Sequence, residues 1–138
     1  WPLLKFAFRT SRAIPIAPAK EDPAMMEQAF AEVGRALDAG DLVGIFPEGK
    51  ITADGEISPF RSGMSRILAR NPVPVVPMAL RGLWGSFFSR KNGPAMTRPF
   101  PRGVFSKIEL VMGAAIPAAE ATPERTQAVV AGMRGDCV

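Results

Sequence analysis

Histidine and tyrosine are both absent from this sequence of 138 residues. Without histidine, the chain cannot contain a histidine general base, a Ser-His-Asp triad or a metal site built on imidazole. Cysteine occurs once, at Cys137, which excludes an internal disulfide and makes a reduced, cytosolic setting the expectation. No apolar run approaches the roughly 20 residues of a membrane-spanning helix. The apolar start, residues 1–8, also lacks a signal-peptide cleavage pattern.

The charge balance is mildly basic, with a net charge of +4 and a pI near 9.8. This favours anionic partners such as phosphate head groups, acidic membrane surfaces or nucleic acid, and does not choose among them. No internal repeat, low-complexity run or linker marks a boundary, so residues 1–138 are interpreted as a single domain. Because the sequence begins with Trp1 instead of methionine, we expect a fragment or an excised domain.

The most informative stretch is LVGIFPEGK, residues 42–50. Its first residues are β-formers and predict a buried strand, which Pro47 ends because proline cannot donate to a strand ladder. Glu48, Gly49 and Lys50 follow directly. Glycine there allows a positive φ or a close approach of a ligand to the backbone, and lysine suits phosphate. Open α/β sheets place their sites at such strand ends. The alternative is a turn with a solvated charge pair.

Periodicity and capping residues predict the other elements. Residues 22–39 read as a helix with Asp22 as N-cap and Gly40 as its stop. Strands at residues 13–18 and 42–46 on either side of it imply a right-handed crossover and a parallel pair. Six further elements are expected: a helix within residues 1–12, a turn at Asp54-Gly55, a helix at 60–70, strands at 74–80 and 104–113, and a last helix capped by Thr122.

Residues 81–102 are irregular and mix aromatic side chains with cations: Trp84, Phe87, Phe88, Arg90 and Lys91. Such a mixture suits a membrane interface and suits stacking on single-stranded nucleic acid equally well. The plainer alternative is a loop that packs its aromatics on the domain itself. No known nucleic-acid motif is present, so we expect no nucleic-acid partner.

The stretch FPEGKIT resembles the FPEG block of the glycerolipid acyltransferases, which acylate glycerol-3-phosphate and lysophospholipids. Its form is most similar to the acyltransferase domain of bacterial bifunctional 2-acylglycerophosphoethanolamine acyltransferases. Three further stretches fit the family in its order: AIPIAP at 13–18, FRSG at 60–63 and PVVPMAL at 74–80. The resemblance covers about residues 13–113. It implies an α/β fold with a mixed, mostly parallel sheet flanked by helices.

The same resemblance implies an acceptor-binding site. Glu48 and Gly49 match the family directly. Lys50 stands at a position where the family commonly has threonine. The next residue, Ile51, stands where the family usually has an arginine that binds phosphate. We therefore infer that Lys50 substitutes for that arginine as the phosphate cation. In the earlier block the arginine position falls on Pro18, which leaves Lys20 as the nearest cation. The implied substrate-binding residues are Phe46, Pro47, Glu48, Gly49, Lys50, Arg61, Gly63, Pro77 and Lys20.

The implied reaction transfers an acyl group from an acyl-carrier-protein or coenzyme A thioester to a hydroxyl of a lysophospholipid or 1-acylglycerol-3-phosphate. Its implied place is the cytoplasmic face of the inner membrane, either as a peripheral protein on the membrane surface or as a domain of a membrane protein. The family's general base comes from an H-x-x-x-x-D block that is absent here, most simply by amino-terminal truncation. No catalytic residue, metal or cofactor is therefore assigned, and we expect the isolated chain to be inactive. One alternative is a basic peripheral membrane- or nucleic-acid-binding module without catalysis. Another is a phosphate-binding hydrolase, but this sequence has no Gly-rich phosphate loop to support it.

Overall fold

The computed structural model describes residues 10, 12–16, 21–85, 89–91, 93–94 and 107–135. The chain divides into two compact units, Trp1–Gly44 and Ile45–Val138. Almost all of the helix predicted within residues 1–12 lies outside the described residues, and so do Lys20, Phe87 and Phe88.

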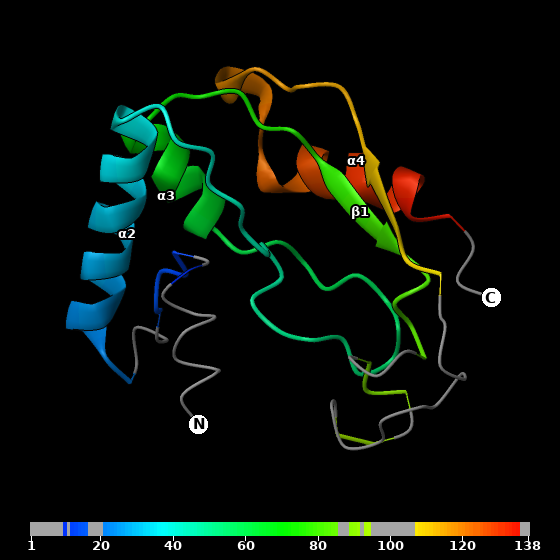
Figure 1. Ribbon diagram of the computed structural model, residues 1–138. Coiled ribbons are helices and arrows are strands. Elements are labelled where there is room, and N and C mark those ends of the chain that lie inside the picture. Colours follow the sequence, from blue (N-terminus) through cyan, green and yellow to red (C-terminus); the bar gives the residue numbers. More distant parts are fainter. Residues whose placement is uncertain are drawn as a thin grey trace. The chain divides into compact units, whose positions relative to one another are not determined.

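The first unit contains helix α2, Pro23–Asp38 (Figure 1). The Asp22 carboxylate accepts a hydrogen bond from the Met25 N–H at 2.9 Å, which satisfies one of the free donors of the first turn. Ala29 and Val33 from the apolar stripe are buried. The helix predicted from the capping residues and the apolar spacing is therefore confirmed.

The strands predicted on either side of α2 are not formed. Residues 13–16 and 42–46 are described without strand pairing. Leu42 and Phe46 have exposed fractions of 102% and 85%, so the predicted buried strand is wrong here. The β-forming side chains are present, but a strand exists only where a neighbour pairs with its N–H and C=O groups. No described segment pairs with these two, and the mostly parallel sheet is not found.

The second unit contains a two-stranded antiparallel sheet. Strand β1, Met78–Arg81, pairs with strand β2, Glu109–Met112. Helix α4, Pro123–Arg134, packs along this pair, and Ala79 is buried (Figure 1). The other face is apolar and open to solvent: Met78, Leu80, Leu110 and Met112 are between 43% and 63% exposed. Strand β2 lies within its predicted range, of which residues 104–106 are outside the described part of the chain. Strand β1 begins four residues later than predicted and ends one residue later, at Arg81.

Pro77 stands just before β1, at an irregularity of the pairing. An isolated bridge joins Val75 to Ile116, and the regular ladder begins only at Met78. On the side of β1, two residues, 76 and 77, lie between the bridge and the ladder. On the side of β2, three residues, 113–115, lie between them. The Pro77 carbonyl accepts the Gly113 N–H at 2.9 Å. A bulge is therefore present opposite Pro77, and its extra residue lies in the partner strand, within residues 113–115.

Two more helices are described in this unit: α3, Gly63–Arg70, and the short 3-10 helix η1, Ala118–Glu120. Helix α3 begins three residues later than predicted; its Met64 is buried and its arginines are exposed. The Thr122 hydroxyl caps α4 by accepting the Arg125 N–H at 3.2 Å, which confirms the predicted last helix. Among the described helices, none is long and apolar enough to cross a membrane.

Candidate functional site

The FPEG residues form a β-turn. The Gly49 N–H donates to the Phe46 carbonyl at 3.1 Å. Pro47 takes the second position, where its fixed φ suits a turn, and Gly49 takes the fourth with a φ of 64°. That left-handed conformation favours glycine because a Cβ would crowd the neighbouring carbonyl. The proline and the glycine of this block are therefore explained by the turn that they build.

The FRSG block, residues 60–63, contacts this turn directly. The Arg61 N–H donates to the Pro47 carbonyl at 2.9 Å. The Arg61 side chain lies over the turn, because a Cβ added to Gly49 would stand 2.9 Å from the Arg61 Nε. Glycine thus has a second role here, which is to let the guanidinium approach the backbone. The structure brings the two blocks together although ten residues separate Gly49 from Phe60 along the chain.

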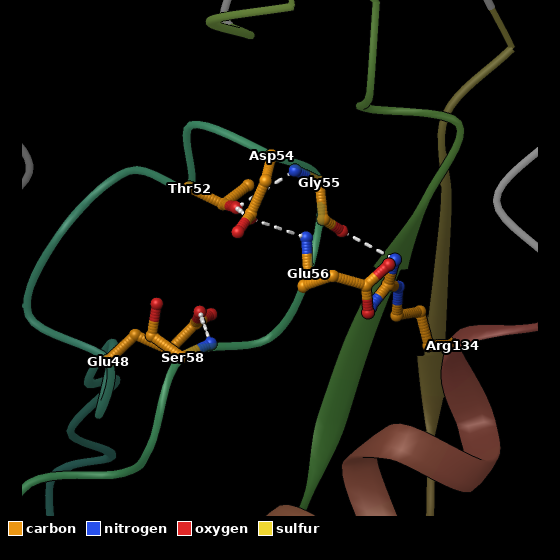
Figure 2. A network of polar contacts seen from close by, with 7 residues as sticks. All are labelled: Glu48, Thr52, Asp54, Gly55, Glu56, Ser58 and Arg134. Carbon is orange, nitrogen blue, oxygen red and sulfur yellow. Dashed lines mark hydrogen bonds and ion pairs between the residues drawn. The ribbon is translucent and has the colours of Figure 1, made fainter.

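Glu48 closes the base of the loop that follows the turn. Its half-buried carboxylate accepts the Ser58 N–H at 2.7 Å (Figure 2). A hydrogen bond to an ionised acceptor is stronger than one between neutral groups. Glu48 therefore joins the two ends of a loop that contains Lys50, and the geometry gives it a structural role in the site.

The tip of the loop is held by its own side chains (Figure 2). The Asp54 carboxylate accepts the Glu56 N–H at 2.9 Å and the Thr52 hydroxyl at 2.8 Å, while the Gly55 N–H donates to the Thr52 hydroxyl at 3.1 Å. These contacts are Asx- and ST-type turns, and they confirm the predicted Asp54-Gly55 turn. The Glu56 and Thr52 donors, with a smaller contribution from the charge of Lys50, hold the pKa of Asp54 below its ordinary value.

Helix α4 and Trp84 also contact this loop region. The Phe60 N–H donates to the Gln127 Oε1 at 3.0 Å, and the Arg134 guanidinium donates to the Glu56 carboxylate and to the Gly55 carbonyl. The Trp84 ring lies against Gly55, where an added Cβ would be 2.8 Å from it. For Trp84, the structure therefore shows packing on the domain.

The sequence did not indicate Ser58, Gln127 or Arg134. Ser58 lies 10 residues along the chain from its partner Glu48. Gln127 lies 67 residues from Phe60, and Arg134 lies 79 residues from Gly55. Side chains that serve a distant loop leave no periodic or motif signal in their own segment. Only the structure finds them.

The remaining predicted site residues are placed as follows. Phe46 and Lys50 are exposed, and Gly63 is the first residue of α3. Pro77 is buried and lies close to Gly113, which is also adjacent to Met133 of α4, so its visible contacts are those of packing. Lys20 lies outside the described residues. A group of three acidic or cysteine side chains able to hold a metal ion is not found in the part of the chain that the structure describes.

Two cations thus accompany one glycine turn: Arg61 lies over Gly49, and Lys50 follows it. Both side chains belong to exposed residues. A guanidinium offers planar, two-pronged donation to phosphate, and an ammonium offers a compact charge. This arrangement is chemically suited to a phosphate monoester at the protein surface.

The family model described as Acyltransferase matches residues 1–81, more than half of the chain. This chain belongs to the acyltransferase family. The match includes the FPEG turn, Arg61 and β1. The resemblance inferred from the four blocks is therefore confirmed at the level of the family.

Curated relatives of this acyltransferase chain are 1-acyl-sn-glycerol-3-phosphate acyltransferases. That of Limnanthes alba is 30% identical over 102 residues, which are 73% of this chain and 34% of the relative. A chloroplastic enzyme of Brassica napus is 31% identical over 81 residues, 59% of this chain and 23% of the relative. The enzyme of Cocos nucifera is 34% identical over 83 residues, which are 59% of this chain and 26% of the relative. The chain spans about a third or less of the length of these relatives, and no solved structure matches it.

Proposed function

We propose that this chain is the acceptor-binding part of a glycerolipid acyltransferase, with 1-acylglycerol-3-phosphate or another lysophospholipid as acceptor. The observation that supports this most directly is the meeting of Arg61 and Lys50 at the Gly49 turn. The names of the relatives support the class of acceptor. The form FPEGKIT favours a bacterial bifunctional acyltransferase as the parent.

In the proposed reaction, the acceptor hydroxyl attacks the carbonyl carbon of an acyl thioester on acyl-carrier protein or coenzyme A. A carbon–oxygen bond forms, the carbon–sulfur bond breaks, and the hydroxyl proton passes to a general base. With no histidine in its sequence, this chain would supply the acceptor's binding and orientation. Holding the phosphate fixes the glycerol hydroxyl relative to the thioester, and such positioning is itself a large contribution to rate.

Binding of a soluble, short-chain 1-acylglycerol-3-phosphate, measured by calorimetry below its micelle concentration, tests the proposal. The same acylglycerol without phosphate is the matched ligand. Lys50→Ala and Arg61→Ala should each weaken binding by roughly tenfold to a hundredfold, because a hydrogen bond to a charged group contributes about 1.5–3 kcal/mol. Arg70→Ala, an exposed arginine at the end of α3, is the control and should bind like the unchanged protein.

Equal affinity for the ligands with and without phosphate would contradict the proposed acceptor site. In the complete enzyme, Lys50→Ala should raise the KM for the acceptor and leave that for the acyl donor nearly unchanged. A change in the donor KM alone would remove the assignment of this turn to the acceptor's phosphate.

We also propose that the protein works on a membrane surface, at the cytoplasmic face of the inner membrane. The exposed Arg90 and Lys91 and the basic pI near 9.8 support attraction to anionic lipid. Flotation with anionic vesicles should weaken in the Phe87→Ser, Phe88→Ser double variant. Equal flotation of both proteins would show that these aromatics do not dock on lipid.

A further inference from the structure

One face of α4 is directed at the candidate site. Gln127 and Arg134 are seven residues apart, two turns of helix, so they project from the same side. Gln127 accepts the N–H of Phe60, the first residue of the FRSG block, at 3.0 Å. Arg134 reaches the tip of the loop that begins at Lys50. A single helix therefore contacts both segments that build the acceptor site.

The helix that carries these side chains is itself anchored. It packs on β1 and β2, and the Arg81 Nε of β1 donates to the Met133 carbonyl at 2.7 Å. That bond satisfies one of the carbonyls left free in the last turn of α4. Arg134 therefore extends from a fixed element of secondary structure, which positions a site more accurately than a loop does.

Arg134 makes two different contacts with the loop (Figure 2). One guanidinium nitrogen donates to the Glu56 carboxylate at 3.1 Å, and the other donates to the Gly55 carbonyl. The Arg134 side chain is only 18% exposed, whereas that of Glu56 is 75% exposed. An exposed ion pair contributes little, so the shielded bond to the backbone carbonyl is the more important contact.

The backbone at the other end of this bond is confined from a second side. Gly55 has a φ of 87°, and the Trp84 ring lies against its Cα. The loop tip is thus held between an aromatic ring and a guanidinium. Arginine suits this task because its planar fork can serve a carboxylate and a carbonyl together, which one ammonium group does less well.

We propose that Arg134 is a positioning residue for the acceptor site. By holding the Gly55 carbonyl it fixes the loop between Glu48 and Ser58, and so places the Lys50 ammonium where it meets the acceptor's phosphate. This inference rests on the proposed function. Arg134 lies outside the residues that match the family model, so the support comes from a part of the chain that the family match does not cover.

The test compares Arg134→Met and Arg134→Lys with Arg125→Met as the control. Methionine keeps much of the aliphatic stem and removes the donors, and lysine keeps the charge. Arg125 is an exposed arginine of the same helix whose partner is Glu120. Two quantities are measured in the 138-residue chain: hydrogen exchange in residues 50–58, and calorimetric affinity for the short-chain 1-acylglycerol-3-phosphate.

Arg134→Met should speed exchange in residues 50–58 by about tenfold and leave exchange in β1 unchanged. It should weaken binding by roughly fivefold to tenfold, Arg134→Lys should restore part of the loss, and Arg125→Met should have no effect. In a Lys50→Ala background, Arg134→Met should weaken binding much less. A role confined to general stability would not produce this dependence on Lys50.

Unchanged affinity in Arg134→Met would overturn the inference, and so would an equal loss with and without Lys50. If Arg134→Met does not fold, Arg134→Lys carries the same test, because one ammonium should give an intermediate loss of affinity; full retention there counts against the inference. If the unchanged protein shows no preference for the phosphate-bearing ligand, the proposed function fails, and this inference fails with it. The two failures are thus distinguishable.

Discussion

Replacing Gly49 with alanine tests the link between the FPEG turn and the cation beside it. Gly49 has a φ of 64°, where a residue with a Cβ costs about 1–2 kcal/mol. The new Cβ would also stand 2.9 Å from the Arg61 Nε and 3.1 Å from its Cδ. Carbon atoms normally approach one another to about 3.5–4 Å. Because these atoms belong to a long flexible side chain, we expect the guanidinium to move away while the turn persists.

The two consequences have separate magnitudes. The backbone term should lower stability by about 1–2 kcal/mol, which corresponds to a fall in Tm of roughly 3–10 °C for a chain of this size. Displacing Arg61 should weaken binding of the phosphate-bearing acceptor by roughly tenfold. Gly40→Ala provides the matched control: its φ is 81°, but no atom lies within 4 Å of the added Cβ. That variant should lose stability and keep its affinity.

Thermal unfolding and calorimetric titration of Gly49→Ala and Gly40→Ala measure both effects. The same substitution at Gly49 in an Arg61→Ala background should cause little further loss of affinity, because the displaced cation is already gone. If Gly49→Ala binds the acceptor as tightly as Gly40→Ala does, the reasoning about the approach of Arg61 is refuted. An equal loss of affinity with and without Arg61 would refute it as well.

Three further predictions concern activity, pH and the core. With no histidine, the isolated chain should not transfer acyl groups from an acyl-carrier-protein thioester to a lysophospholipid; turnover seen by mass spectrometry and abolished by Glu48→Ala would disprove this. The lowered pKa of Asp54 means that its turn contributes stability above the ordinary value of 3.8 and loses it as the pH falls through the lower, folded-state value. The Glu56 amide resonance should therefore titrate below 3.8, and a midpoint at or above that pH would contradict the turn contacts. The buried Thr126 hydroxyl has no hydrogen-bond partner among the described residues, so Thr126→Val should raise stability by about 1 kcal/mol in chemical denaturation, and a fall would mean that the hydroxyl is bonded.

Features with local causes were predictable from the sequence. Asp22 caps α2 because its side chain reaches an N–H three residues away, and the turn at Asp54 closes through neighbours within the same few residues. The helix from Thr122 follows the same rule. In each case the residue type and its partner stand close together in the chain, so the pattern contains the whole interaction.

Features with distant causes were not predictable. The apolar residues 42–46 have the composition of a strand, but composition does not supply the neighbour that a strand needs. The pairing of β1 with β2 joins segments about thirty residues apart, which is too far for a short hairpin turn to indicate it. For the site, the FPEG and FRSG blocks were recognised. The bonds from Glu48 to Ser58 and from Arg134 to Gly55 depend on how the chain returns on itself.

The bulge beside Pro77 changes which way the following side chains point. Side chains along a strand alternate between its two faces, and Met112 of β2 points to the open face, with 63% of it exposed. Continued without interruption, this alternation would send Ile116 to the same open face. The extra residue within 113–115 shifts the phase by one, and Ile116 is only 6% exposed where it pairs with Val75. Gain or loss of one residue in this short stretch would therefore exchange inside and outside for the segment that leads into η1.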